Sequence, residues 1–163
     1  MNTVKGASAL YHSMLEPETT HKGYDKWENI VQIDKEHWHD SFPFLKSTTK
    51  DTKLRWFQLR VLHQTLTTNK SVSYFKRDQN PLCEFCRSHN ETIHHLLWKC
   101  TKVNKFWENL FKAINDKCHH SHNLRIDEKL ILFGKCELAK TDSVSDLIIL
   151  IGKFYIYRNK VKK

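Results

Sequence analysis

The chain has 163 residues, enough for one domain with a single core, and its 39 % hydrophobic content excludes a disordered composition. With 4 glycines and 3 prolines, it lacks the composition of a collagen-like, linker-like or turn-dense all-β protein. Its formal net charge of +9 indicates a polyanionic partner, with nucleic acid and anionic membrane as the main classes, although a basic surface can also serve solubility alone.

The first residues predict little regular structure. A short helix fits residues 4–15, Pro17 ends it, and the polar residues 17–23 are typical of a linker. Residues 1–15 lack the apolar core of a signal peptide, and no stretch reaches the ~18 apolar residues that span a bilayer. We therefore expect an intracellular protein, in the nucleus or the cytoplasm, with no membrane partner.

Helical periodicity begins after this linker. Residues 24–44 predict one or two short helices, and Pro43 is expected to break the run because proline lacks a backbone donor. Residues 45–53 are polar and basic, and Asp51 or Thr52 among them is expected to cap the next helix.

The next helix has the clearer pattern and is expected over residues 53–66. Its apolar side is formed at spacings of three and four by Leu54, Phe57, Val61, Leu62 and Leu66. Residues 67–69 stop it and are expected to cap a short helix through Tyr74 and Phe75, before a turn at residues 78–81.

The second half of the chain is also helical in pattern. Residues 92–100 and 103–114 predict two helices, and residues 130–133 form a short apolar run of undecided type. The second of these helices has an apolar face made by Val103, Phe106, Trp107, Leu110, Phe111 and Ile114. Ser143 and Asp146 resemble a capping box at the start of a last helix. The predicted apolar stripe of that helix contains Val144, Leu147, Ile148, Ile151, Phe154 and Tyr155. The fold class predicted is mainly α.

A metal-binding motif lies in the middle of the chain. Cys83 and Cys86 are separated by two residues, eight more precede His95, and four separate His95 from Cys100. Two cysteines at that spacing can bind one ion from a tight turn, and His95 and Cys100 would share a helical face, about 1.4 turns apart, or meet at a frayed helix end. Three cysteines and one histidine predict one closed, structural zinc site in a unit spanning residues 81–101.

Alternatives to this site remain open on the sequence. The cysteines could be free thiols of the core, and His94 or His89 could replace His95 as the fourth ligand. A second dense group, formed by Cys118, His119, His120 and His122, could bind a further metal or be a solvated loop. Cys136 is expected to be a thiol without a role, and His63 a core or surface histidine.

Several motifs in this order resemble the zinc-binding C-terminal region of reverse transcriptases from non-long-terminal-repeat (LINE-type) retrotransposons. They are Asp51-Thr52-Lys53-Leu54, Trp56-Phe57-Gln58, Leu62-His63, Thr68-Asn69, Pro81-Leu82-Cys83-Glu84-Phe85-Cys86, Glu91-Thr92-Ile93, His95-Leu96, Cys100, Phe106-Trp107, Leu132-Phe133-Gly134 and Gly152-Lys153-Phe154-Tyr155-Ile156-Tyr157-Arg158. The resemblance covers most of residues 24–163, which we take as the zinc-binding domain, and residues 1–23 resemble a remnant of the segment after the polymerase thumb, with a linker.

The resemblance implies an accessory role beside a polymerase. In this family the region follows the palm and thumb and is taken to help hold template RNA or target DNA. The polymerase itself needs paired aspartates for two magnesium ions, and this sequence has no adjacent Asp pair. We therefore expect no enzyme activity from a chain that resembles the accessory region without its polymerase core, whether a degraded element, a fragment or a co-opted domain.

Basic residues provide the predicted nucleic-acid contacts. They are Lys53, Arg55, Arg60, Lys99, Lys102, Lys105, Arg158 and Lys160. Trp56, Tyr74 and Phe75 lie near basic clusters and could stack on unpaired bases, although core packing is the more common fate of such aromatics.

The function predicted is sequence-tolerant RNA or DNA binding by a structural-zinc accessory domain, with the polymerase core of a full-length element as a further partner. The rival is a protein-interaction or purely structural module, or a relic, that once packed on the thumb and exposes an apolar patch when alone. A hydrolytic zinc enzyme would need a vacant coordination position and a nearby general base, and the four-ligand motif offers neither.

Overall fold

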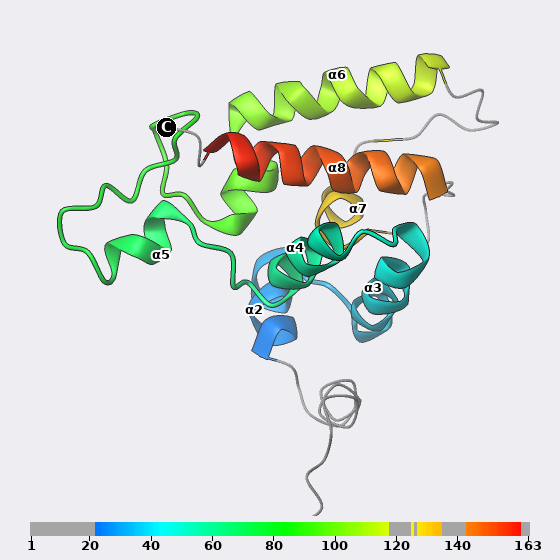
Figure 1. Cartoon of the computed structure of the whole chain (residues 1–163). Helices are drawn as coiled ribbons and strands as arrows, with labels where there is room; N and C mark the ends of the chain where they lie inside the picture. The colour runs from blue at the N-terminus through cyan, green and yellow to red at the C-terminus, as the bar shows by residue number, and fades with distance from the viewer. Residues whose placement is uncertain (1–21, 118–124, 126, 135–142, 161–163) are drawn as a thin grey trace, which may run out of the picture.

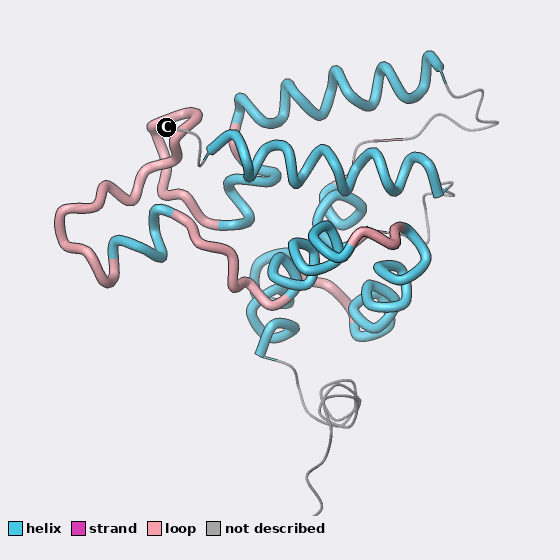
Figure 2. Tube along the Cα trace, viewed as in Figure 1, coloured by secondary structure: helices cyan, strands magenta, loops and turns pink. Residues whose placement is uncertain are grey.

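The computed structural model describes residues 22–117, 125, 127–134 and 143–160, which form helices joined by loops (Figures 1 and 2). The helices are α2 (Lys22–Val31), α3 (Lys35–Thr48), α4 (Thr52–Leu62), α5 (Asn69–Ser73), the π-helix η1 (His95–Lys99), α6 (Thr101–Lys117), α7 (Glu128–Phe133) and α8 (Ser143–Lys160). The described residues contain no strand beyond one antiparallel bridge between Leu82 and Asn90, which confirms the mainly α fold. Among these helices, none combines the length and the apolar character that crossing a membrane requires.

The prediction that Pro43 breaks the helical run is wrong. Helix α3 continues through Pro43 to Thr48, so the connection to α4 is short. Pro43 removes the hydrogen bond to the His39 carbonyl, but both residues are exposed, so water can serve that carbonyl. Trp38 and Phe44, on either side of the proline, are buried and hold the helix against the core.

Helix α4 begins as its sequence indicates and ends earlier than predicted. The Asp51 side chain accepts hydrogen bonds from the amides of Lys53 and Leu54, which makes Asp51 the N-cap. The chain leaves the helix at Leu62, and Gln64 adopts a positive φ of 53°. The predicted apolar side is nevertheless buried throughout: Leu54, Phe57, Val61, Leu62 and Leu66.

Helix α7 settles the undecided run at residues 130–133. Asp127 caps it, and all four apolar residues of the run are buried. Phe133 packs edge-on against Trp27 of α2, with ring centroids 5.3 Å apart. Gly134 ends the helix with a φ of 89°, and a Cβ there would lie 2.2 Å from the Phe44 ring, so only glycine fits this exit.

Helix α8 lies at the centre of the fold, in contact with α3, α4, α7 and η1, but it buries a different face from the predicted one (Figure 1). In the predicted stripe, Val144, Ile151 and Tyr155 are exposed, and the other members are half-buried. The buried positions are Ser145, Asp146, Ile149, Leu150, Gly152, Lys153, Ile156 and Lys160. Apolar residues occur on all sides of α8, so the hydropathy pattern selects a face that is exposed or half-buried in the structure. Two of the polar groups on the true inner face, Lys153 and Lys160, have partners in other segments of the chain.

One of these inner polar groups is Lys153, whose side chain is 1 % exposed. Its Nζ donates to Gln58 Oε1 of α4, and Gln58 Nε2 donates to the Leu132 carbonyl at 2.8 Å. This chain of hydrogen bonds joins α8, α4 and α7 in the core. Burial lowers the pKa of Lys153 to about 7, although the charge of Asp146 acts in the opposite direction.

This burial predicts a pH-dependent stability. Between pH ~7 and ~10.5 the unfolded chain binds the Lys153 proton more tightly than the folded chain, so the free energy of unfolding should rise with pH, by at most about 1.4 kcal/mol per pH unit. Lys153→Met removes this contribution. Urea unfolding at about pH 7.5 and about pH 9.5 should show a steeper rise for wild type than for Lys153→Met, while exposed Lys26→Met keeps the wild-type slope. Equal slopes for all three chains would contradict a buried, proton-poor Lys153.

Candidate metal centre

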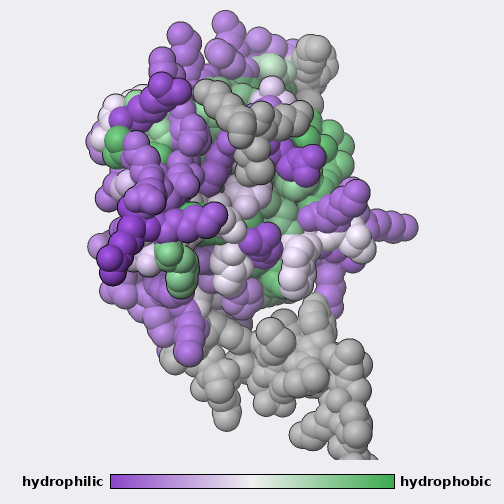
Figure 3. All heavy atoms as spheres, turned by 60° about the vertical axis from the view of Figure 1, so that its left-hand side comes forward, coloured by the Kyte–Doolittle hydropathy of each residue, from purple (hydrophilic) through white to green (hydrophobic). Residues whose placement is uncertain are grey.

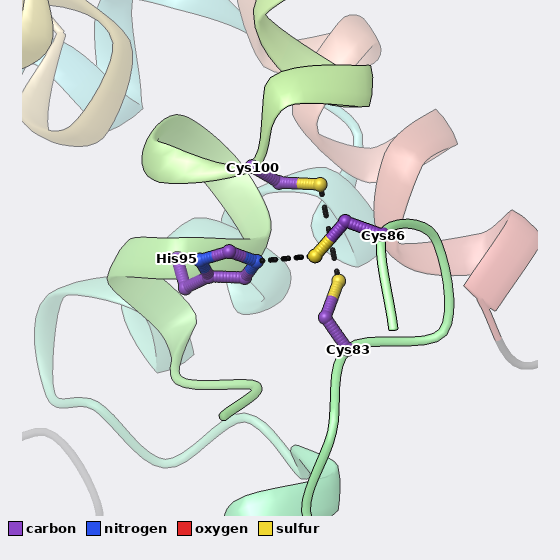
Figure 4. Close-up of side chains that lie close together, drawn as sticks. All are labelled: Cys83, Cys86, His95 and Cys100. Atoms are coloured by element: carbon purple, nitrogen blue, oxygen red, sulfur yellow. Dashed lines mark hydrogen bonds between the residues drawn. The ribbon is translucent and has the colours of Figure 1, made fainter. Parts of the chain in front are cut away.

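The four predicted ligands, which come from a loop and from the helical segment after it, converge on one point (Figure 4). Cys83 and Cys86 come from a loop, His95 from η1, and Cys100 from the junction between η1 and α6. Their donor atoms all lie within 4.8 Å of one another, and the residues are buried or half-buried. Within the described part of the chain, this is the one group of at least three such side chains placed to hold a metal ion.

The distances agree with the edges of a metal-centred tetrahedron. Cys83 Sγ and Cys100 Sγ are 3.9 Å apart, and Cys86 Sγ lies 3.3 Å from His95 Nε2. For Zn–S bonds of about 2.3 Å and Zn–N bonds of about 2.0 Å, tetrahedral geometry gives donor separations of roughly 3.8 and 3.5 Å. Three sulfurs and one imidazole nitrogen also form a donor set that suits zinc, whereas calcium and magnesium prefer oxygen ligands.

A backbone framework shapes the loop that holds the first two cysteines. The amide of Cys83 donates to the His89 carbonyl, and the amide of Arg87 donates to the Cys83 carbonyl, each at 2.8 Å. Arg87 turns the chain with a positive φ of 53°, and the Leu82–Asn90 bridge closes the base. These backbone bonds place the two sulfurs on the same side of the loop.

The second pair of ligands depends on a π-helix. In an α-helix, residues five apart differ by about 140° around the axis, so His95 and Cys100 would not share a face. Here the Cys100 amide donates to the His95 carbonyl at 2.9 Å, the five-residue bond of a π-turn. The wider turn brings the two side chains together, with Cys100 at the C-terminal end of η1 rather than on a shared α-helical face.

The rival histidines are not among the four converging side chains, although His89 lies beside them. His94 Nε2 pairs with Glu128 Oε1 of α7, which directs its ring away from the sulfurs. His89 is exposed, and its ring stacks on that of His95 with centroids 5.4 Å apart. The alternative group Cys118, His119, His120 and His122, as well as Cys136, lies outside the described residues, as does the helix expected over residues 4–15.

The thiols differ in their tendency to ionise. Burial raises the pKa of the Cys83 thiol to about 12. Burial acts the same way on Cys86, but hydrogen bonds from the Ser88 amide and from His95 and His89 outweigh it and lower the pKa to about 6. Because a metal ion binds the thiolate, Cys86 is better prepared than Cys83 to bind an incoming cation.

Glu91 is a residue whose role the sequence did not indicate. Its carboxylate is fully buried and accepts hydrogen bonds from the amides of Asn69, at 2.9 Å, and Glu84, at 3.1 Å. It also forms an ion pair with Lys160 of α8, which in addition donates to the Thr67 carbonyl. Glu91 therefore joins α5, the metal-binding loop and the end of α8. No spacing rule connects these segments, so a sequence pattern could not have revealed it.

The predicted nucleic-acid contacts differ in accessibility. Lys53, Lys99, Lys102, Lys105 and Arg158 are exposed. Arg55 and Arg60 are half-buried, and each donates to backbone carbonyls, Arg55 to those of Thr49 and Lys46 and Arg60 to that of Thr65. Lys160 is a correction: an ammonium buried in an ion pair with Glu91 cannot reach a phosphate.

The three aromatics that were candidates for stacking are on the surface. Trp56 is 64 % exposed, Tyr74 73 % and Phe75 89 %. Core packing, the more common fate, therefore does not apply to them. Tyr74 and Phe75 follow α5, in a segment that projects from the helical body (Figure 1).

Comparison with known proteins gives one match. The family described as zinc-binding in reverse transcriptase matches residues 11–107, which include all four converging ligands. No curated protein and no solved structure matches the chain.

Proposed function

This chain belongs to the family of zinc-binding domains in reverse transcriptase, and from that membership we propose that it is a structural-zinc accessory domain that binds single-stranded RNA or DNA. The family is an accessory zinc-binding region and not the catalytic core, which fits a role without chemistry of its own. The observation that carries the proposal is the Cys3His cluster with exposed lysines directly beside it.

One zinc ion would bind Cys83, Cys86, His95 and Cys100 and leave no position for a water or a substrate. Closed sites of this kind stabilise structure, and free energy of zinc binding becomes free energy of folding. Here the ion would fasten the loop to η1 and to the start of α6. Trp107 of α6 adds to the same junction, since its Nε1 donates to the Leu97 carbonyl at 2.8 Å.

Exposed lysines lie next to the last metal ligand, Cys100, in the sequence. Lys102 and Lys105 lie three residues apart in α6 and so share one side at its start, and Lys99 is the last residue of η1, just before Cys100. Lys99 lies 3.9 Å from Glu128, a contact at the limit of an ion pair, while Lys102 and Lys105 are directed to solvent. Phosphate contacts from such lysines carry no sequence information, which supports sequence-tolerant binding.

A salt titration tests the proposal. Wild type should bind a labelled single strand of about 12 nucleotides in fluorescence anisotropy, with affinity falling steeply between about 50 and about 200 mM salt. The double variant Lys102→Gln/Lys105→Gln should reduce the slope of log affinity against log salt by about 1.4, because each phosphate contact to a single strand contributes about 0.7.

The matched control is Lys26→Gln/Lys35→Gln, which removes the same charge from exposed positions on α2 and α3. It should leave the slope nearly unchanged. Equal losses in the two double variants would show that only net charge matters, and no binding by wild type at low salt would reject nucleic-acid binding altogether.

The retrotransposon context is part of the same proposal, and the polymerase core of a longer element is the protein partner that it implies. A second candidate function, a protein-interaction module, is favoured by the outward apolar residues of α8, Val144 and Ile151. Figure 3 shows an apolar area on a surface that is otherwise mostly hydrophilic. Sedimentation in high salt separates the two, because apolar self-association persists when nucleic-acid complexes dissociate.

A further inference from the structure

A hollow of about 220 Å³ lies where the metal-binding loop meets α6 and α8. Phe85 of the loop, Phe106 of α6 and Tyr155 of α8 provide its aromatic walls, and Val103 and Ile156 add aliphatic surface. Lys102 is the one charged residue in the lining, which contains no acidic side chain. An apolar hollow with a single cation at its edge suits a flat ligand that carries a negative charge.

The aromatic walls are arranged to stack. The rings of Phe106 and Tyr155 are nearly parallel, with an interplanar angle of 17° and centroids 6.0 Å apart. Tyr155 is 58 % exposed, whereas Phe106 is half-buried and packs edge-on against Trp107. Phe106 therefore packs beside the tyrosine ring, and the exposed part of Tyr155 leaves room for a third ring where it borders the hollow.

We propose that this hollow binds one unpaired base of a single-stranded nucleic acid, stacked on Tyr155, with the adjoining phosphate at Lys102. The proposal rests on the nucleic-acid binding proposed above. It adds a defined contact to a base, where the proposed function names only contacts between lysines and phosphates. Every base has an aromatic face, so this contact is sequence-tolerant, and a base within a duplex cannot reach it. The metal site takes part indirectly, because Phe85 lies between Cys83 and Cys86 and zinc would fix that wall.

Charge favours a base over an apolar peptide as the occupant. Exposed Lys99 and Lys105 lie on the same segment as Lys102, and Arg158 is exposed near the end of α8, 5.9 Å from the Phe154 ring centroid. A strand of nucleic acid satisfies both the rings and this basic border. An apolar peptide would leave Lys102, the one cation of the lining, without a negative partner.

The test compares Tyr155→Ala, Tyr155→Phe and, as a control on the same helix, exposed Val144→Ala, all in the zinc-loaded full chain. Truncating the ring should weaken binding to an oligothymidylate of about 12 nucleotides by roughly 5- to 150-fold, without changing the salt slope. Tyr155→Phe and Val144→Ala should bind as wild type does. A strand with a 5-iodouracil should form a photocrosslink to Tyr155 or Phe85, identified by mass spectrometry, and a duplex should not.

Salt-dependent wild-type binding together with unaltered binding by Tyr155→Ala would overturn the base site and leave the proposed function intact. If Tyr155→Ala instead abolished self-association at high salt, the hollow would be a protein contact. Absence of wild-type binding at low salt would overturn both proposals.

Discussion

Replacing Cys100 with serine should abolish stoichiometric zinc binding and lower the free energy of unfolding by at least about 4 kcal/mol. Cys100 is fully buried, its Sγ lies 3.9 Å from that of Cys83, and its amide closes the π-turn. Serine keeps the backbone bond but provides no thiolate. Structural zinc contributes roughly 10–16 kcal/mol of apparent binding energy in zinc-finger peptides, so most of the support for this loop should depend on the ion.

Metal content by elemental analysis and native mass spectrometry gives the direct measurement. We expect about one zinc per wild-type chain and almost none in Cys100→Ser. His94→Gln is the matched control, because His94 is adjacent to a ligand but pairs with Glu128. That variant should retain the metal. Loss of zinc in His94→Gln with retention in His95→Gln would mean that the neighbouring histidine is the ligand, and wild type without zinc would contradict the site.

A chelator should reproduce the effect of the variant. Its action should be visible at Trp107, whose indole is fully buried and bonded to the Leu97 carbonyl beside η1. Removing the ion frees η1 to relax toward a narrower helix, which would move that carbonyl. A near-ultraviolet circular dichroism signal that changes with chelator and returns with zinc would be expected for wild type and absent for Cys100→Ser.

The ligand residues could be predicted because their chemistry is local. Two cysteines at C-x2-C spacing, followed by His95 and Cys100, admit few alternatives, and the structure brings these four together. The backbone that achieves this could not be predicted. A π-turn has no propensity signal of its own, and the spacing of five residues between His95 and Cys100 is the one indication that an ordinary α-helix would fail there.

The buried face of a helix could also be predicted where the apolar residues lie on one side, as in α4 and α6. Trp107, Phe111 and Ile114 line the buried side of α6 as their spacing indicates. In α8 the same reasoning selects the wrong face, because Lys153 and Lys160 point inward. A lysine is buried only where a distant partner compensates it, here Gln58 and Glu91, and such pairings across the chain leave no periodic trace in the sequence.

The ion pair between Glu91 and Lys160 provides the second large effect. Replacing Glu91 with glutamine should destabilise the fold by roughly 3–5 kcal/mol, because it leaves the Lys160 ammonium buried without a counter-charge. Urea unfolding of the zinc-loaded chain measures the loss. The loss should persist in high salt, since buried pairs are screened far less than surface pairs. Zinc content should stay at the wild-type value because Glu91 is not a ligand.

A double variant and a matched control test this prediction further. Glu91→Gln/Lys160→Met removes both charges and should be more stable than Glu91→Gln alone, because an apolar side chain replaces an unpaired buried ion. Glu84→Gln changes a half-buried carboxylate in the same loop and should cost less than about 1 kcal/mol. If Glu91→Gln lowered the free energy of unfolding no more than Glu84→Gln does, the Glu91 carboxylate would not stabilise the contact between the metal-binding loop and α8. The end of α8 would then be held by its apolar contacts alone.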